Sequence, residues 1–187
     1  MDINQFISEV NAVDWNSFTN SVYSYYKPEN VPAALIALAV VESEFIVREP
    51  KGNIKKKQSL FSWLSKEKQK DTNPNVNFDV CHSVLTAIGN NHRGTYYAVV
   101  REALPFIMKV ALSGNHLIAR YCALEILYTL CIMFCPEDWS DEKRAEKLEL
   151  FVKNEVKNFI LENAESIEAF GNSNELSKQL ANELMEI

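Results

Sequence analysis

The segment His116–Phe134 has the sequence HLIARYCALEILYTLCIMF and decides the fold class. As a helix it carries apolar side chains on almost every side, and such a helix lies inside a protein or a membrane. A membrane span needs about 20 predominantly apolar residues, whereas Glu125 and Thr129 interrupt this stretch near its middle. The segment therefore predicts a helix at the centre of a helical protein.

Helical patterns also flank this segment on both sides. Apolar residues at helical spacing predict further helices over residues 2–13, 14–26, 32–39, 78–88, 97–112, 140–167 and 174–187. The chain of 187 residues contains only five glycines and six prolines, too few for the many tight turns of a β-sandwich or a β-barrel. We expect a single all-α domain over residues 1–187, in which residues 140–187 form the C-terminal helices.

Two pairs of weakly similar segments predict how the helices are arranged. The pattern Pro32-x-x-Leu35-x-x-Leu38-Ala39 matches Pro105-x-x-Met108-x-x-Ala111-Leu112 at a separation of 73 residues, and the stripe Cys81, Val84, Leu85, Ile88 matches Arg120, Ala123, Leu124, Leu127 at a separation of 39. Removal of an insertion of about 30 residues brings the first separation near the period of roughly 40 that HEAT and armadillo repeats show. We therefore predict a HEAT/armadillo-like array of antiparallel helix pairs, with an irregular helical bundle as the alternative.

Residues 50–77 are predicted to be a flexible, basic insertion in this array. Seven lysines and two acidic residues lie within residues 51–71, which gives this stretch a net charge of +5. The net charge of the whole chain is −6, so the other residues together carry −11. A protein that binds nucleic acid presents a basic surface to the phosphates, and this body has the opposite sign. We expect the body to repel nucleic acid and to attract basic proteins.

The four cysteines, Cys81, Cys122, Cys131 and Cys135, all lie within apolar helical patterns. A free thiol in such a pattern behaves as a small hydrophobic group, which predicts reduced core residues. A zinc site is the alternative, but Cys131 and Cys135 are four residues apart, and no histidine or further cysteine lies beside Cys122. The N-terminal residues show no signal-peptide pattern. We expect a cytoplasmic protein with no metal or other cofactor.

The turn Ile88-Gly-Asn-Asn-His-Arg-Gly-Thr-Tyr-Tyr97 carries a family resemblance, together with Val13-Asp14-Trp15, Asn30-Val31-Pro32 and Ala103-Leu-Pro-Phe-Ile107. These segments resemble HEAT-like helical immunity proteins of bacterial polymorphic-toxin and contact-dependent growth inhibition systems. The resemblance covers roughly residues 13–136, and His92-x-Gly94-x-Tyr96-Tyr97 is its most specific part. It implies an intracellular antitoxin without enzymatic activity. Such a protein binds and blocks the C-terminal domain of one cognate toxin, often a nuclease, as a monomer in a 1:1 complex.

The same turn supplies four candidate partner-binding residues, His92, Arg93, Tyr96 and Tyr97. Tyrosine and arginine often dominate the binding energy of protein interfaces, which favours a contact with the toxin. The structural alternative assigns Asn90 to a helix cap and Gly94 to a special backbone angle. It also assigns the histidine or a tyrosine hydroxyl to a hydrogen bond with a neighbouring loop. Both interpretations fit the sequence.

A second candidate group combines an acid with two aromatic residues of the central segment. Glu125 has Tyr121 and Tyr128 within one helical turn on either side. Buried carboxylates are rare unless they are paired. Either Arg120 or another base therefore satisfies Glu125 internally, or the three side chains lie open on a concave face and meet a basic partner. Further candidates on this face are the acids Glu42, Glu44 and Asp79, which we expect to speed association.

The alternative function is a HEAT-like nucleic-acid-binding protein or DNA glycosylase. A glycosylase of this kind needs a basic concave groove, and the charge of −11 outside the lysine-rich stretch argues against one. Cys81 and His82 are neighbours in sequence, so on a helix they point about 100° apart rather than toward each other. The sequence therefore predicts no catalytic residue, and we expect neither nucleic acid nor a membrane among the partners.

Overall fold

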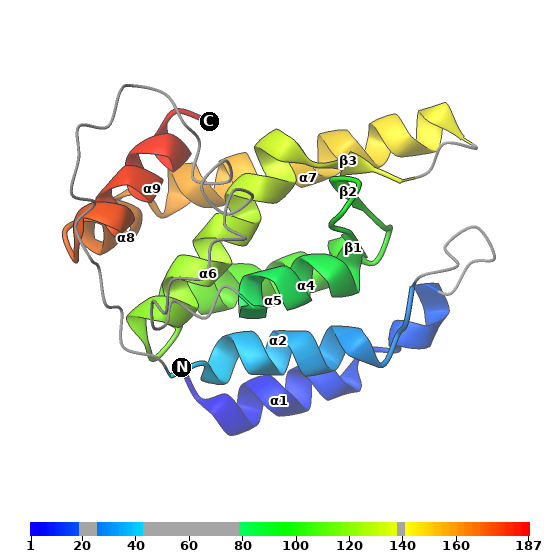
Figure 1. The fold of residues 1–187 in the computed structure, drawn as a ribbon, viewed down its shortest axis with the longest axis horizontal. Coiled ribbons are helices and arrows are strands. Elements are labelled where there is room, and N and C mark those ends of the chain that lie inside the picture. Colours follow the sequence, from blue (N-terminus) through cyan, green and yellow to red (C-terminus); the bar gives the residue numbers. More distant parts are fainter. Residues whose placement is uncertain (19–25, 43–78, 138–140) are drawn as a thin grey trace, which may run out of the picture.

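Helices dominate the part of the chain that the structure, a computed structural model, describes: residues 1–18, 26–42, 79–137 and 141–187. The α-helices are α1 (Ile3–Ala12), α2 (Asn30–Val40), α4 (Asp79–Ile88), α5 (Val100–Ser113), α6 (Leu117–Tyr128), α7 (Glu142–Glu162), α8 (Ala164–Gly171) and α9 (Glu175–Met185). A 3₁₀ turn covers Trp15–Phe18, and three two-residue strands are β1 (Gly89–Asn90), β2 (Thr95–Tyr96) and β3 (Cys135–Pro136). The predicted all-α class is confirmed (Figure 1).

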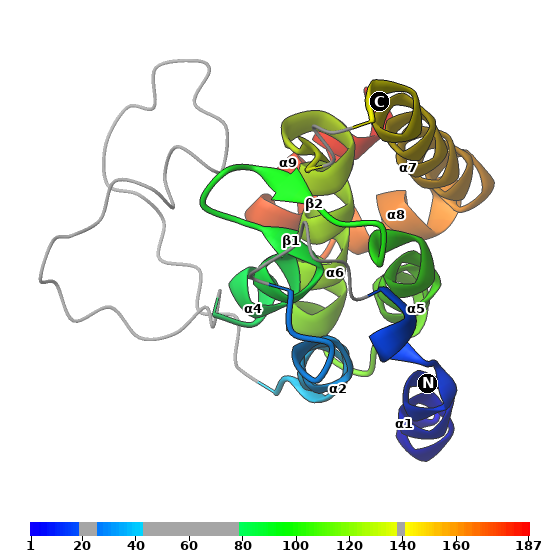
Figure 2. The same cartoon turned by 90° about the vertical axis from the view of Figure 1, so that its right-hand side faces the viewer.

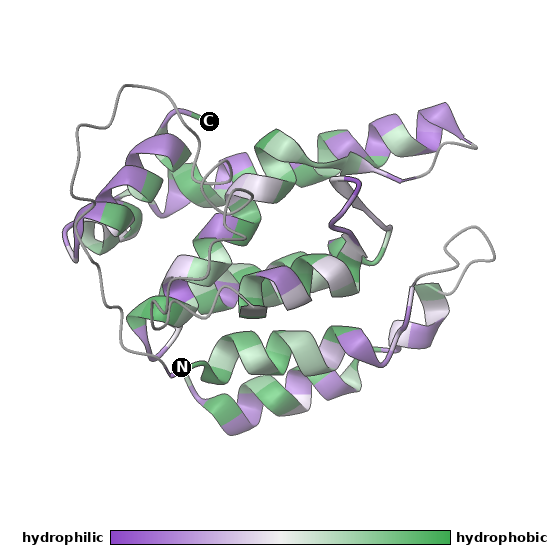
Figure 3. Cartoon of the chain, in the orientation of Figure 1, coloured by the Kyte–Doolittle hydropathy of each residue, from purple (hydrophilic) through white to green (hydrophobic). Residues whose placement is uncertain are grey.

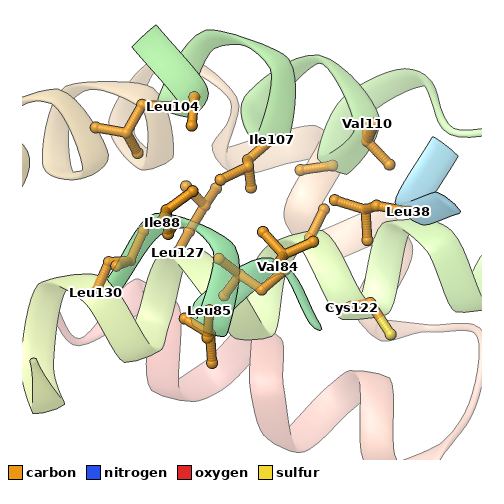
Figure 4. Packing of buried hydrophobic residues seen from close by; sticks show 14 of the residues in the cluster. Leu38, Val84, Leu85, Ile88, Leu104, Ile107, Val110, Cys122, Leu127 and Leu130 are labelled. Carbon is orange, nitrogen blue, oxygen red and sulfur yellow. The ribbon is translucent and has the colours of Figure 1, made fainter. Parts of the chain in front are cut away.

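Helix α6 lies at the centre of the core, as the sequence predicts. Its residues from Ile118 to Leu127 are buried except for the half-buried Arg120, and a π-helical turn, Thr129–Met133, continues it. Helices α2, α4, α5 and α9 all pack against it. Figure 4 shows the core beside it, where Val84 and Ile88 of α4 meet Ile107 of α5 and Leu127 of α6. The hydropathy colouring shows α2 as mostly apolar, whereas apolar and polar residues alternate along α7 and α9 (Figure 3).

The helices around α6 form two adjoining pairs. Helix α2 packs on α4, and α5 packs on α6; across the pairs, α2 contacts α5 and α4 contacts α6. Figures 1 and 2 show α1 on the outer side of α2. The residues matched in the sequence comparison fall on α2 with α5 and on α4 with α6. This pairing fits a repeat of two helix pairs, although the repeat itself stays a prediction.

The three short strands form a clasp that the sequence did not predict. Strand β1 pairs antiparallel with β2, and β2 pairs parallel with β3, so Thr95 lies opposite Cys135. The predicted end of α4 before Gly89 is correct, but the chain continues directly into β1. A Cβ atom on Gly89 would lie 2.1 Å from the carbonyl oxygen of Thr95, so only glycine permits this approach. Gly94 has a φ of +67°, as the special backbone angle predicts.

The C-terminal helices differ from the prediction at one point. The apolar pattern predicts one helix from residue 140 to 167, but α7 ends at Glu162 and α8 begins at Ala164. Asn163 interrupts the helix because its Nδ2 donates to the carbonyl oxygen of Phe159 at 2.8 Å. Asn174 caps α9 through a hydrogen bond from the backbone N–H of Ser177. Helices α8 and α9 then form a hairpin, packed chiefly on each other.

Some predictions fall outside the described residues. These are the insertion over residues 50–77, the site residue Glu44, and most of the helix expected over residues 14–26. Within the described ranges, no helix has both the length and the apolar character that crossing a membrane would require.

Candidate functional site

The structure does not bring the ten predicted partner-binding residues together on one surface. Glu42, His92 and Arg93 are exposed, and Tyr128 is half-buried. Tyr96, Tyr97, Tyr121 and Glu125 are buried. Asp79 is the first residue of α4, and the position of its side chain lies outside what is described.

Three of the four tyrosines belong to the core, so their prediction as contact residues is wrong. Tyr97 packs edge-on against Tyr26, with ring centroids 5.9 Å apart, and Tyr121 lies 6.4 Å from the ring of Phe170. Tyr96 is 1% exposed, and among the described residues its hydroxyl has no hydrogen-bond partner. A large aromatic ring gains most of its stabilisation from apolar contacts. Here that gain comes from the protein interior rather than from a partner.

The turn between β1 and β2 contains the exposed His92 and Arg93. The carboxylate of Glu137 accepts a hydrogen bond from Thr95 Oγ1 at 2.5 Å and lies 3.7 Å from the guanidinium of Arg93. These contacts tie the turn to the residue after β3. His92 stacks edge-on with His82 at 6.1 Å between ring centroids. The turn is thus held by polar contacts other than those of the structural alternative: Asn90 lies in β1 rather than at a helix cap, and only the special backbone angle of Gly94 is confirmed. His92 and Arg93 stay accessible.

The C-terminal end of α2 lies at the other end of the α2–α4 pair from the β1–β2 turn (Figure 1). Glu42 follows this end of α2, and its Oε1 lies 3.5 Å from Nε2 of His116, just before α6. The β1–β2 turn follows the opposite end of α4. Glu42 and the pair His92–Arg93 therefore cannot act as one compact contact patch.

The open-face interpretation of Glu125 is wrong, and the paired interpretation finds no base for it among the described residues. Its side chain is 3% exposed, so it does not lie open on a concave face. Arg120 does not pair with it: Nε of Arg120 donates to the carbonyl oxygen of Ala111 at 3.0 Å, and the guanidinium lies over the ring of Phe170. Burial, and then the carboxylate of Glu183, raise the pKa of Glu125 to about 7.

The last two helices present an acidic surface that the residue predictions missed. Among residues 162–187 there are six glutamates against the single base Lys178. We name the exposed members the C-terminal acidic surface: Glu162, Glu165, Glu168, Glu175 and Glu186. Two exposed apolar side chains lie in the same region, Leu161 at 65% and Met185 at 40% exposure. Acidic residues outnumber basic ones within residues 140–187, so a charge count over this range alone could have indicated the surface.

A shallow hollow of about 410 Å³ lies between α2 and α4. Its lining consists of small side chains, including Ala33, Ala37, Ser83 and Ala87, and contains no titratable group. Within the described ranges, no three His, Cys, Asp or Glu residues are grouped in a way that could hold a metal ion. All four cysteines are free thiols, three of them buried and Cys135 half-buried. The lining of the hollow therefore gives no indication of an acid–base or metal site.

Comparisons of the chain with protein-family models, with curated proteins and with solved structures gave no match. The functional argument consequently depends on the residues of this chain.

Proposed function

We propose that this protein is an immunity protein that binds the C-terminal domain of one cognate toxin and blocks its active site. The toxin domain is a basic protein, in the first instance a nuclease. The observation that supports this proposal best is the C-terminal acidic surface, with its excess of exposed glutamates over Lys178. The family resemblance of residues 13–136 supplies the class of partner.

Charge complementarity is the first step of the argument. A nuclease must attract a polyanion, so the surface around its active site is basic. An acidic surface on the inhibitor attracts that same region, accelerates encounter and disfavours acidic proteins as partners. An inhibitor guided in this way competes directly with the nucleic acid for the basic cleft.

Apolar contact is the second step, because charge alone gives fast but weak association. Leu161 at the end of α7 and Met185 at the end of α9 expose much of their apolar side chains beside the glutamates. Lys157 Nζ donates to the carbonyl oxygen of the terminal residue Ile187 at 3.1 Å, which holds the ends of α7 and α9 together. An interface here would have an apolar centre and an acidic rim, the usual arrangement in protein complexes.

The test uses the toxin domain encoded immediately upstream of the gene for this protein, purified as a catalytically dead variant. Stopped-flow association is measured with the variant Glu165→Lys/Glu168→Lys and with the control Glu102→Lys/Glu146→Lys, which changes net charge equally at exposed sites elsewhere. We expect the first variant to associate about tenfold more slowly at low salt, with the difference shrinking as salt rises. Leu161→Ala should instead accelerate dissociation, by about 1 kcal/mol of binding energy.

Equal effects of the two charge variants would contradict the proposed surface. Failure of the wild-type protein to bind or inhibit the toxin domain would contradict the function. Affinity for DNA with a steep salt dependence would instead support the alternative, a nucleic-acid-binding protein or DNA glycosylase.

A further inference from the structure

Two carboxyl groups lie close to each other where α9 packs on α6 (Figures 1 and 2 show the two helices). Glu125 of α6 is 97% buried, and its Oε2 has no hydrogen-bond partner among the described residues. Glu183 of α9 is half-buried: its Oε1 accepts from Gln179 Nε2 at 3.2 Å, whereas its buried Oε2 has no hydrogen-bond partner among the described residues. The carboxylate of Glu183 repels an ionised Glu125. An unpaired buried charge is among the most unfavourable groups in a protein interior.

The groups that face Glu125 are neutral or acidic. They are Cys81 of α4, Tyr121 and Tyr128 of α6, and Glu183 of α9. Burial raises the pKa of Tyr121 and of Cys81, so both stay protonated near neutral pH. Within the described ranges, no lysine, arginine or histidine forms an ion pair with Glu125. The described residues around Glu125 therefore offer no positive charge to stabilise its ionised form.

A proton is the remaining means of neutralising this site. Burial penalises the ionised form, and the carboxylate of Glu183 adds repulsion, which together raise the pKa of Glu125 to about 7. In the packed structure Glu125 therefore holds its proton through the acidic range and loses it near neutral pH. Once the carboxyl group meets water, its pKa returns toward the ordinary value of 4.5.

The α8–α9 hairpin is the element whose movement would bring Glu125 into water. The two helices pack chiefly on each other and contact the rest of the protein less extensively. Phe170 of α8 rests on Tyr121 and Arg120 of α6, and Leu180 and Leu184 of α9 are fully buried. The hairpin can thus separate from α6 as a unit while its own internal packing is kept.

We propose that the α8–α9 hairpin is a pH-responsive element: Glu125 is protonated when the hairpin is docked on α6, and loss of that proton to solvent favours an open hairpin in which Glu125 and Glu183 are both hydrated. The hairpin carries most of the C-terminal acidic surface, so opening also exposes further negative charge at this end of the protein. The proposal stands on the buried carboxyl pair and does not depend on the toxin.

The direction and size of the effect follow from proton linkage. The open state binds the Glu125 proton more weakly than the docked state, so the opening constant rises with pH between about 4.5 and about 7 and is level above. These limits give an increase of about 50-fold between pH 5 and pH 7.5. Phe170, Leu180 and Leu184 still favour docking at both pH values, so the open state grows in population without becoming the main form.

Hydrogen exchange of the full chain tests this proposal. Protection factors, which already correct for the intrinsic pH dependence of exchange, are measured for α9 amides between pH 5 and pH 8, with α5 amides as the internal reference. In the wild type, α9 protection should fall about 50-fold and should stay below α5 protection at every pH, because opening of the hairpin leaves α5 packed. Glu125→Gln should abolish the fall. Glu183→Gln should reduce it and move its midpoint to lower pH, and the exposed Glu168→Gln should behave as wild type.

Three results would overturn the proposal. The first is a level wild-type profile. The second is an unchanged fall in Glu125→Gln, or in Glu183→Gln if Glu125→Gln does not fold. The third is equal protection of α5 and α9 at every pH, because that pattern indicates that both helices are exposed by unfolding of the whole domain rather than by opening of the hairpin.

Discussion

Replacing Tyr96 by phenylalanine removes one buried hydroxyl and leaves the ring in place. Tyr96 is 1% exposed, and its hydroxyl has no hydrogen-bond partner among the described residues. An unsatisfied buried polar group is unfavourable by about 1–3 kcal/mol. Tyr96→Phe should therefore leave the free energy of unfolding unchanged or raise it by about 1 kcal/mol. For a chain of this length a gain of that size raises Tm by about 2–4 °C.

Tyr26 provides the matched control for this substitution. It is also buried, at 8% exposure, but its hydroxyl donates to the carbonyl oxygen of Trp15 at 2.8 Å. Tyr26→Phe removes that bond from the protein interior, so it should lower the free energy of unfolding by about 1 kcal/mol. The same chemical change thus has opposite expected signs at the two positions.

Urea unfolding, followed by far-ultraviolet circular dichroism, measures both variants against the wild type. The dependence of free energy on urea should stay the same, so that a shifted midpoint reports stability alone. A loss in Tyr96→Phe as large as that in Tyr26→Phe would refute the reasoning, because it would mean that the Tyr96 hydroxyl is paired. If the Tyr96→Phe variant has normal stability but binds the toxin domain weakly, Tyr96 is a contact residue after all.

Two further predictions concern stability. Because the pKa of Glu125 in the folded protein is raised from 4.5 to about 7, folding binds a proton between these values, and stability present at low pH is lost as pH rises through that window. Between pH 5 and pH 7.5 this contribution changes by about 2.3 kcal/mol, which corresponds to the 50-fold factor for hairpin opening; urea titrations at these two pH values should show it as a difference between wild type and Glu125→Gln, and an equal difference at both pH values would count against it. Gly89→Ala should lower the free energy of unfolding by about 3 kcal/mol through its backbone collision, and Gly94→Ala by only about 1 kcal/mol through its positive φ. Thermal denaturation of the two variants measures which loses more stability. A larger loss in Gly94→Ala would show that the positive φ of Gly94, rather than the lack of space at Gly89, constrains the clasp more.

The helical class and the central position of residues 116–134 could be predicted because both follow from local periodicity. A helix that is apolar all round has only one stable environment in a protein without a membrane. The special backbone angle of Gly94 could also be predicted, because a positive φ depends only on the absence of a side chain at that residue. The break at Asn163 was not, because the apolar stripe runs through it and does not reveal that the Asn163 side chain donates to the carbonyl oxygen of Phe159.

The site residues were harder to predict because exposure depends on packing between distant segments. Tyrosine suits both a core and an interface, and only the position of β2 beside β3 decides that Tyr96 is buried. For Glu125 the sequence suggested a pair or an open face, whereas the structure gives it a second acid from α9. The clasp could not be predicted because strands of only two residues are too short to show the alternation of apolar and polar residues that indicates a strand.

The parallel pairing of β2 with β3 determines when the fold can be completed during synthesis. Thr95 finds its partner only when Cys135 has left the ribosome, 40 residues later. At about 5–20 residues per second this interval lasts roughly 2–8 s. Helices α5 and α6 lie entirely within it, so their hairpin has time to form before the clasp closes over it. The buried carbonyl and N–H groups of β2 meanwhile depend on β1 and water alone, which makes this edge the place where a nascent chain is most exposed to incorrect strand pairing.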